Sequence, residues 1–437
     1  MSGPLEGLRV LDLSRLLPGP FCSLLLADLG AEVLKVEDTG MGDYVRWSPP
    51  YVEGVEESAR SALFLALNRN KRSIRLDLKS ERGREVLLRL VREHDVLLES
   101  FRPGVLDRLG VGYDRLKQEN PGLVYCAVTG YGQDGPYRDR AGHDMNYLGL
   151  GGMLALTGER GGPPVQNAGQ VADVGGGALM AAVGILAALQ ERQRSGEGQL
   201  VDVSMTDGAL SWLAMLAAQQ LNDPAARALR RGELPLSGAL LCYRPYACAD
   251  GWVTLGALEP KFWQGWCRGV GREDLVERQF DPPGSEAHAQ VEAIFAARTR
   301  DEWAAFAAEH DCCLEPLLEL DEALESELVR AREMVVSLDQ PGAREPVRLL
   351  GLPIKLSRTP GDPTRAPGPA LGGDTDAVLE EAGYGAAEIA ALKEAGVVAG
   401  PPSGVQGSFL GGQSAGGDSL ADSAGAESAG AQGASSG

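Results

Sequence analysis

The sequence predicts an α/β protein with a Rossmann-like, doubly wound large domain and a smaller α+β domain. Short apolar strands alternate with helical segments over the first 200 residues, which is typical of a parallel sheet with helices on both faces. The length of 437 residues exceeds what a single core usually fills and favours two or three domains. Hydrophobic residues make up 44% and charged residues 23%, so we expect most of the chain to fold.

The first strand–helix–strand unit is predicted near the amino terminus. Residues 8–13 indicate a buried strand, residues 21–30 a helix ended by Gly30, and residues 31–37 a second strand. A helix capped by Ser80 follows in the same pattern. Further strands are predicted at 73–78, 95–100 and 123–128. Because parallel strands need crossover helices, these segments predict a mostly parallel sheet.

The second half of the large domain carries two long apolar helices. One is predicted from the glycines at 175–177 to Gly196, and the other, after a strand at 200–205, over 206–221. Loop composition then begins, so we place a domain boundary near residue 225. The predicted parts are a large domain over 1–224, a small α+β domain over 225–345, a return segment over 346–400 that completes the large domain, and a disordered Gly/Ser/Ala tail over 401–437.

The charge balance limits the partners. The chain has 61 acidic and 41 basic side chains, a formal net charge of −20, which repels phosphate backbones and anionic lipid. We therefore expect no nucleic-acid partner. The amino terminus carries Glu6, Arg9 and Asp12 and does not fit a signal peptide, and no uninterrupted apolar run reaches about 18 residues. These features predict a cytoplasmic protein without a membrane partner.

Cysteines and histidines give no metal-binding pattern. The seven cysteines include no CxxC pair, and none of the four histidines falls in an HExxH motif or at zinc-finger spacing. We expect reduced, mostly buried thiols and no metal site.

The most informative acidic residue is Asp173, which stands just before glycines 175–177 and a buried helix. Backbone N–H groups and the positive helix end converge there. The spacing fits a simple N-cap, but glycines also let a ligand approach the backbone, as a thioester carbonyl would need. His143 and Asp144 precede a short apolar segment. They are either a surface histidine and a helix cap, or a pair for proton transfer.

Other candidates are individually weaker. Glu259 precedes Pro260, a usual first helical residue, although glutamate is a poor cap. Basic residues gather at Arg69, Lys71 and Arg72 and again around Phe101, next to Arg102 and with Arg108 further on. They are either loop charges or an anion pocket with an aromatic platform, suited to a phosphorylated adenine nucleotide.

Several motifs together resemble the class III CoA-transferase (CaiB/BaiF) family over residues 4–395. The His-Asp and Glu motifs resemble its α-methylacyl-CoA racemase branch. The motifs are LSRLLPGPFCSLLLADLGAEVLKVE, LNRNKRSIRLDLK, ESFRPG, AGHDMNYLGLGG, VADVGGG, RSGEGQLVDVSMTDG and GALEPKFW.

The resemblance assigns roles by position. Asp173 matches a carboxylate that is an acyl-accepting nucleophile in transferases and a proton-transfer group in racemases. His143 and Glu259 match the racemase partner pair. The matching CoA-binding positions, with Lys71 in the same basic cluster, are Arg72, Phe101, Arg102, Arg108 and Arg140. Many members have a CoA-contacting arginine where this chain has Asp38. The usual phosphate or adenine contact at this position is therefore left open, with Arg46 as a candidate substitute.

These assignments lead to a mechanistic expectation. His143 and Asp173 would exchange the α-proton of a 2-methylacyl-CoA on opposite faces, with Glu259 and Asp144 orienting the imidazole. N–H groups after Asp173 would meet the enolate oxygen. No cofactor is expected beyond the CoA of the acyl-CoA substrate.

Two alternatives remain open. One is a CoA-transferase acting through an acyl anhydride on Asp173 and an enzyme-bound CoA thioester. The other is a non-catalytic CoA-binding scaffold. The resemblance also implies an interlocked homodimer, in which Glu259 acts from the same chain or from the partner.

Overall fold

The computed structural model describes residues 3–223 and 229–402, so the predicted tail from residue 403 lies outside the described residues. The chain forms two compact units. The larger unit comprises residues up to 147, 169–209 and those from 333 onward, and the smaller comprises 148–168 and 210–332. The small unit thus starts before the predicted residue 225 and ends before 345. The smaller unit ends earlier than predicted because the hairpin that follows it belongs to the larger unit. This hairpin pairs β10 (Val335–Leu338) with β11 (Val347–Leu350) and packs on α2 (Ala62–Asn68).

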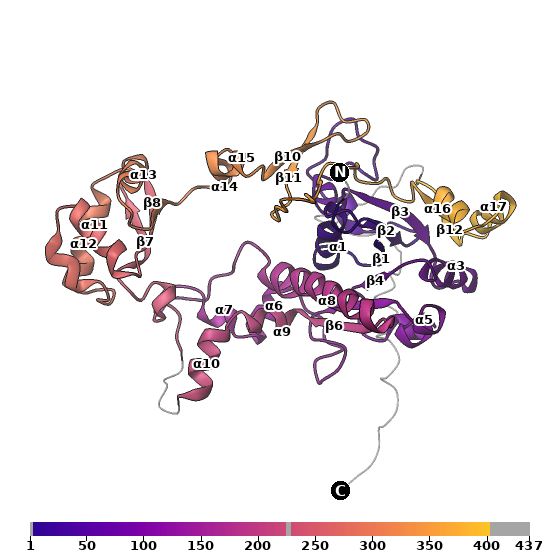
Figure 1. Ribbon diagram of the computed structural model, residues 1–437, viewed down its shortest axis with the longest axis horizontal. Helices are drawn as coiled ribbons and strands as arrows, with labels where there is room; N and C mark the ends of the chain where they lie inside the picture. The colour runs from indigo at the N-terminus through magenta and orange to yellow at the C-terminus, as the bar shows by residue number, and fades with distance from the viewer. Residues whose placement is uncertain (1–2, 224–228, 403–437) are drawn as a thin grey trace, which may run out of the picture. The chain divides into compact units, whose positions relative to one another are not determined.

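A seven-stranded sheet forms the centre of the larger unit (Figure 1). Its order is β12-β3-β2-β1-β4-β5-β6, with parallel pairing except for β12, which lies antiparallel to β3. This is the doubly wound order, and it confirms the predicted fold class. The short edge strand β12 was not predicted. The strands are β1 (Arg9–Asp12), β2 (Glu32–Glu37), β3 (Lys71–Leu76), β4 (Val96–Glu99), β5 (Val124–Thr129), β6 (Leu200–Ser204) and β12 (Val398–Ala399).

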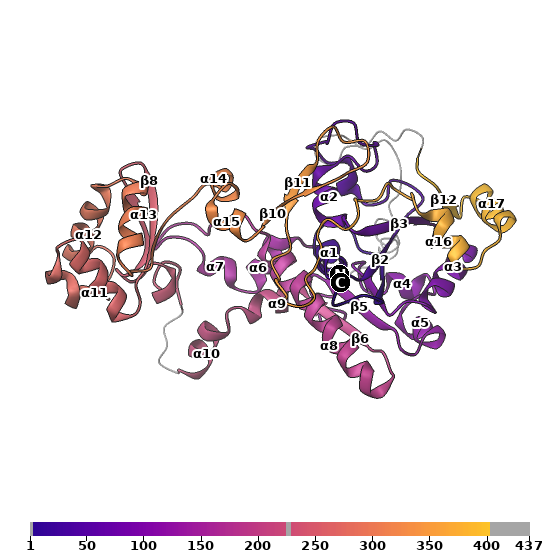
Figure 2. The same ribbon diagram turned by 45° about the horizontal axis from the view of Figure 1, so that its top comes forward.

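One face of this sheet is apolar. Because side chains alternate along a strand, Leu11, Leu34 and Ile74 point to the same side as Leu97 and form one large core. The helices α3 (Glu81–Val91), α5 (Tyr113–Glu119), α16 (Thr375–Glu381) and α17 (Ala386–Glu394) contribute to this core. Figures 1 and 2 show these helices together on one side of the sheet. The Ser80 hydroxyl accepts the Gly83 N–H at 3.3 Å, so the predicted cap of α3 is confirmed.

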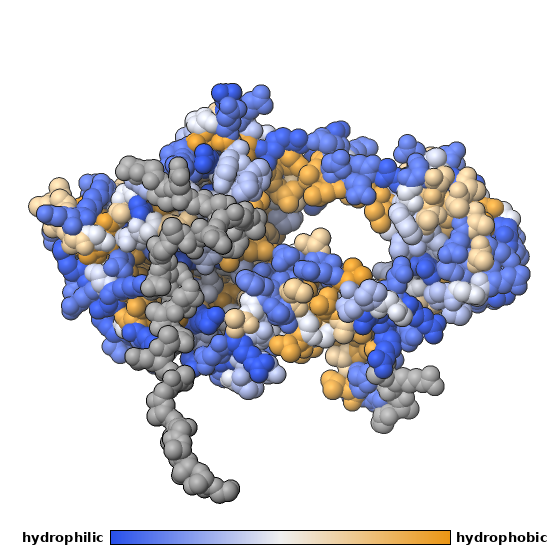
Figure 3. Space-filling view, turned by 180° about the vertical axis from the view of Figure 1, so that it is seen from behind, coloured by the Kyte–Doolittle hydropathy of each residue, from blue (hydrophilic) through white to orange (hydrophobic). Residues whose placement is uncertain are grey.

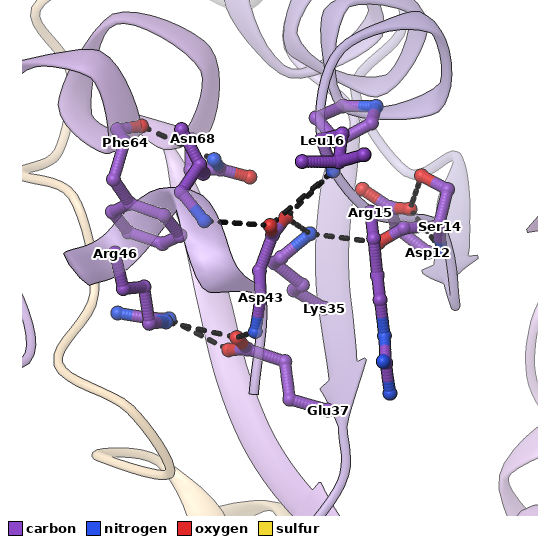
Figure 4. Close-up of polar contacts among 12 residues, drawn as sticks. Asp12, Ser14, Arg15, Leu16, Lys35, Glu37, Asp43, Arg46, Phe64 and Asn68 are labelled. Carbon is purple, nitrogen blue, oxygen red and sulfur yellow. Dashed lines mark hydrogen bonds and ion pairs between the residues drawn. The ribbon is translucent and has the colours of Figure 1, made fainter. Parts of the chain in front are cut away.

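The opposite face carries charges. Asp12 lies opposite Lys35 in the β1–β2 register, and both side chains are fully buried beneath α1 (Pro18–Asp28). Lys35 Nζ lies 3.0 Å from Asp43 Oδ2, and Lys71 Nζ lies 3.3 Å from Asp12 Oδ2. Burial by itself raises the pKa of Asp12, but Lys35, Lys71 and two serine hydroxyls lower it to about 2. Figure 4 shows the Lys35 ammonium facing the Asp43 carboxylate, with Asp12 beside Ser14.

The glycine-rich helix belongs to the same side of the sheet as α1. It begins as a π-helical segment, η2 (Ala172–Leu179), and continues as α8 (Met180–Ser195), which Gly196 ends at a φ of +77°. The helix over residues 172–195 has the length and apolar composition of a membrane-spanning helix. Buried core helices can have the same length and composition. The helix here packs on α1, β5 and β6. The single helix predicted over 206–221 is broken into α9 (Met205–Ser211) and α10 (Ala214–Asn222).

The smaller unit has its own aromatic core. Its sheet is β7 (Tyr243–Cys248), β8 (Gly251–Gly256) and β9 (Leu314–Pro316), all antiparallel. Its main helices are α11 (Pro260–Gly269), α12 (Glu286–Ala296) and α13 (Arg300–Glu309), and they bury Trp263, Trp266 and Trp303 around Phe295. The remaining short elements are η1 (Tyr44–Trp47), α4 (Val105–Arg108), α6 (Asp144–Leu150), α7 (Met153–Leu156), η3 (Pro235–Ser237), η4 (Glu273–Arg278), α14 (Leu320–Leu324) and α15 (Glu327–Ala331).

The buried charges predict a large loss of stability on neutralising Asp12. Asp12→Asn leaves Lys71 and Lys35 without a full counter-charge in a dry interior, so we expect a loss of about 3–5 kcal/mol in the free energy of unfolding. Urea titration followed by circular dichroism measures it. Glu93→Gln removes the exposed Arg9–Glu93 pair at 3.1 Å and should cost about 1 kcal/mol or less. Equal losses in the two variants would contradict this account.

Candidate functional site

The strand order reverses between β1 and β4, and this switch point is where we expect the ligand crevice. In a doubly wound sheet the helices change sides there, and ligands bind outside the carboxyl ends of the strands. The two loops are linked, because the Arg15 N–H donates to Ser100 Oγ at 3.3 Å. The next residues of the β4 loop are Phe101 and Arg102, two of the predicted CoA-binding residues. The Phe101 N–H donates to Glu99 Oε2 at 2.6 Å, which holds this loop against the end of its strand.

Two arginines converge at the start of α4. Gly104 has a left-handed φ of +78°, and a Cβ placed there would lie 3.2 Å from Arg138 Nη2 and 3.4 Å from Arg108 Nη1. Within the described residues, no carboxylate pairs with either guanidinium, and Arg138 Nε is buried without a partner. Arg140 stacks at 3.8 Å over the Tyr137 ring. Adjacent unpaired guanidiniums beside a bare backbone suit a phosphate group.

Sequence reasoning missed Arg138. The residue stands two positions before the predicted Arg140, in the segment PYRDR, and nothing in the spacing distinguishes the two. Both guanidiniums lie beside Gly104, and this proximity of Arg138 to Arg108 is seen only in the folded chain.

The predicted basic cluster divides between opposite ends of the sheet. Lys71 and Arg72 begin β3, so they lie at the amino ends of the strands, away from the crevice. Lys71 is buried, and its Nζ donates to Ser23 Oγ at 2.7 Å and to Asn68 Oδ1 at 2.9 Å. The prediction that Lys71 binds CoA is therefore wrong.

Arg72 occupies a separate hollow. Its guanidinium makes two hydrogen bonds to Glu381, at 2.7 and 2.9 Å, and it lines a cavity of 270 Å³ with Arg9 and Arg89. β3 carries Arg72 to the amino ends of the strands, away from Phe101 and Arg102, so its contact with CoA stays a prediction.

Arg46 does not replace the missing arginine at position 38. Its guanidinium is fully buried, donates to both Glu37 oxygens at 2.8 and 2.6 Å, and stacks 3.7 Å from the Phe64 ring centre. Asp38 itself accepts from Arg15 at 2.6 Å. The expectation that Arg46 takes over this ligand contact is therefore wrong, and Arg15 is the cation found beside Asp38.

Asp173 is not an N-cap. It is the second residue of η2, and the capping position is held by Val171, which makes no side-chain cap. The cap comes from Asp144 on α6, whose Oδ1 accepts the N–H groups of Ala172 at 2.7 Å and Asp173 at 3.0 Å. Asp144 is 1% exposed, and its Oδ2 has no hydrogen-bond partner. The predicted contact of Asp144 with the imidazole is absent.

The surroundings of Asp173 change its charge state. Burial first, and then the Asp144 carboxylate, raise the pKa of Asp173 to about 7. Tyr147 belongs to the same cluster: burial, and next the Asp173 carboxylate, raise the pKa of its hydroxyl. Sequence reasoning missed Tyr147, although its position one helical turn after Asp144 on α6 places both side chains on one face.

The glycines after Asp173 serve packing. A Cβ on Gly176 would lie 2.6 Å from the Met205 carbonyl oxygen, and one on Gly208 would overlap Gly176 in turn, so the two helices meet backbone to backbone. The Val174 N–H donates to the Gln170 carbonyl at 2.9 Å. The expectation that glycines open the backbone to a ligand, with the next N–H as oxyanion donor, is wrong here.

His143 and Glu259 lie on different units. His143 is exposed and directly precedes Asp144, so it lies beside the start of the Asp173 helix, and its N–H donates to Asn146 Oδ1 at 3.0 Å. Glu259 is exposed at the start of α11, without a side-chain capping bond, which confirms the predicted helix start at Pro260. Its pairing with His143 stays a prediction. Among the described residues, no group of three His, Cys, Asp or Glu side chains is placed to hold a metal ion.

Comparisons with known proteins agree on one family. Residues 5–375 match the model of CoA-transferase family III. The chain is 37% identical to an alpha-methylacyl-CoA racemase of Mus musculus, over 89% of this chain and 96% of that protein. It is 35% identical to a succinyl-CoA:mesaconate CoA-transferase of Haloarcula hispanica, over 88% and 97%. A solved CAIB/BAIF family protein from Brucella suis superposes with a TM-score of 0.75 at 32% identity, covering 87% and 100%.

The arginine geometry predicts where CoA phosphates bind. Arg138→Ala and Arg108→Ala each remove a charge-assisted contact, so we expect CoA to bind about 10- to 100-fold more weakly in each. Arg72→Gln is the matched control, because that arginine lies at the opposite end of the sheet, and it should leave the affinity unchanged. Isothermal titration calorimetry with free CoA measures all three. A larger loss in Arg72→Gln than in Arg138→Ala would refute the assignment.

Proposed function

The chain belongs to CoA-transferase family III, and from this premise we propose that it epimerises the α-carbon of a 2-methylacyl-CoA thioester. The racemase of Mus musculus, at 37% identity over nearly the full length of both proteins, supports this reading of the family. His143, Asp173 and Glu259 match the racemase motif.

The observation that carries the proposal is the charge state of Asp173. With a pKa of about 7, this carboxyl is present in both protonation states near neutral pH. A group that takes a proton in one direction and gives it in the other works best at such a pKa. An acyl-accepting nucleophile acts as the ionised carboxylate and does not need to carry a proton in either direction.

In the proposed reaction Asp173 and His143 approach the α-carbon from opposite faces. One removes the α-proton, the thioester carbonyl takes up the negative charge as an enolate, and the other delivers a proton to the second face. Glu259 orients the imidazole from the same chain or from a partner. Arg108 and Arg138 hold the CoA phosphates, so binding energy far from the reacting carbon fixes its position.

The second candidate is CoA transfer between an acyl-CoA and a carboxylic acid. It is favoured by the relative from Haloarcula hispanica, which is nearly as similar as the racemase. In that reaction Asp173 attacks the thioester and displaces the CoA thiolate, forming a mixed anhydride. The thiolate then attacks the Asp173 carbonyl, which releases the donor acid and leaves an enzyme-bound CoA thioester. The acceptor carboxylate attacks this thioester and forms a second anhydride, from which the thiolate takes the acceptor acyl group and frees Asp173. Hydroxylamine traps such an anhydride, so modification of Asp173 that requires acyl-CoA would support transfer.

Deuterium exchange distinguishes the two reactions. In D₂O, with 2-methylacyl-CoA and no acceptor acid, we expect deuterium at the α-carbon by mass spectrometry. His143→Gln and Asp173→Asn should each lower the rate about 10²- to 10⁴-fold, because each removes a proton-transfer group. Arg72→Gln, remote from the crevice, is the control and should exchange normally. No exchange with any 2-methylacyl-CoA would rule out the racemase reading.

We also propose that the chain acts as a homodimer. Large apolar side chains are exposed on helices of both units: Val183 is 62% exposed on α8, and Met215 and Leu221 are 78% and 82% exposed on α10. Figure 3 shows hydrophobic surface on α10. Exposed large apolar side chains that follow one another on a helix, as on α10, favour contact with another chain.

Sedimentation should therefore give twice the chain mass of 46.1 kDa. Replacing Met215 and Leu221 together by Ser should shift the equilibrium toward the monomer. Leu328→Ser is the control. Leu328 is also exposed but lies on α15, away from α8 and α10 in the sequence, so this substitution should leave the monomer–dimer equilibrium unchanged. A monomer for the unmodified chain at micromolar concentration would overturn this proposal.

A further inference from the structure

The start of the Asp173 helix reverses the usual effect of a helix N-terminus. Unpaired N–H groups and the helix dipole normally stabilise a carboxylate in the first turn and lower its pKa. Asp173 is in that turn, yet its pKa is raised to about 7.

Burial is the larger cause of this rise, and the Asp144 carboxylate is the second. The two hydrogen bonds to Asp144 explain why the helix start does not offset them. Asp144 Oδ1 accepts hydrogen bonds from the N–H groups of Ala172 at 2.7 Å and Asp173 at 3.0 Å. The Val174 N–H donates to the Gln170 carbonyl. Three consecutive donors are therefore unavailable to the Asp173 side chain. The positive helix end is also neutralised by a buried carboxylate.

The second feature is the free oxygen of Asp144. Oδ2 is buried and has no hydrogen-bond partner, and Asp144 as a whole is 1% exposed. A buried carboxylate oxygen that accepts no hydrogen bond is costly, so its presence beside Asp173 calls for a role. Asp144 is the only side chain whose charge contributes to the shift at Asp173 among the described residues.

We propose that Asp144 is a positioning residue that keeps Asp173 in a proton-carrying form, by occupying the helix N-terminus and facing Asp173 with a negative charge. This inference rests on the proposed function for its purpose, but the arrangement itself does not depend on which reaction Asp173 performs.

The other groups around Asp173 do not account for its protonation. Tyr147 donates its hydroxyl hydrogen to the Gly142 carbonyl, and Arg102 near it favours ionisation of that hydroxyl. Helix α1 packs on η2, but its one charged residue, Asp28, is at its far end and pairs with Arg69 at 2.7 Å. Asp202 of β6 accepts the Gln133 N–H at 3.0 Å. His143 precedes Asp144 and is exposed.

The test removes the charge of Asp144 and keeps its shape. In Asp144→Asn the amide oxygen still accepts the two N–H groups, but the negative charge is gone, so the pKa of Asp173 should fall by about one pH unit or more. Titration of the Asp173 carboxyl carbon by ¹³C NMR measures this in the whole protein without substrate. The resonance is identified by its loss in Asp173→Asn.

Three further variants keep the outcome decisive. Asp144→Ser caps without charge, so it should lower the pKa as Asp144→Asn does even if the latter folds poorly. Asn146→Ala changes the start of α6 without changing charge and should leave the pKa of Asp173 in place. Asp144→Glu restores the charge and should bring the pKa back toward neutral.

The outcomes separate this inference from the proposed function. An unchanged pKa of Asp173 in both Asp144→Asn and Asp144→Ser would overturn the role of Asp144 and leave the racemase proposal intact. A lowered pKa in Asp144→Asn, together with no deuterium exchange by the unmodified enzyme, would support the role of Asp144 and refute epimerisation. In an active epimerase, the acid limb of the exchange rate should move to lower pH in Asp144→Asn, since more Asp173 is then ionised as the base.

Discussion

The layer of buried charges between the parallel sheet and α1 is the constraint on which the site depends. Its groups bind the backbone of the loop after β1 as well as one another: Lys35 Nζ donates to the Ser14 carbonyl at 2.9 Å, and Asp43 accepts the Leu16 N–H at 3.2 Å (Figure 4). Leu16 has a left-handed φ of +64°, a conformation that a leucine keeps only when its neighbours impose it. The charges thus hold in place the loop after β1, which borders the expected ligand site.

Two aspartates of this fold show how environment sets chemistry. Asp12 and Asp173 are both withdrawn from water, which by itself raises the pKa of a carboxyl. Asp12 faces two ammonium groups and two hydroxyls, and its pKa falls to about 2. Asp173 faces another carboxylate, and its pKa rises to about 7. The first is a permanent counter-ion, and the second can exchange a proton near neutral pH.

The sequence predicted the regular parts of the fold because their signals are local. The strands ending in Asp12 and Glu37, the cap at Ser80 and the helix end at Gly196 follow from period, capping chemistry and glycine conformation. Lys71 and Arg72 could not be separated in this way. Adjacent residues on a strand point to opposite faces, and only the register with β2 shows that Lys71 enters the charged layer.

Local roles predicted for site residues failed where the deciding contact comes from a segment distant in the sequence. Asp173 before its glycines fits an N-cap in one dimension, yet the cap comes from Asp144, and the glycines face another helix. The consequence is chemical. The Asp144 carboxylate raises the pKa of Asp173 beyond the effect of burial and leaves the Asp173 side chain itself in place. The basicity of Asp173 in this chain therefore depends on the residue that faces its helix end as well as on burial.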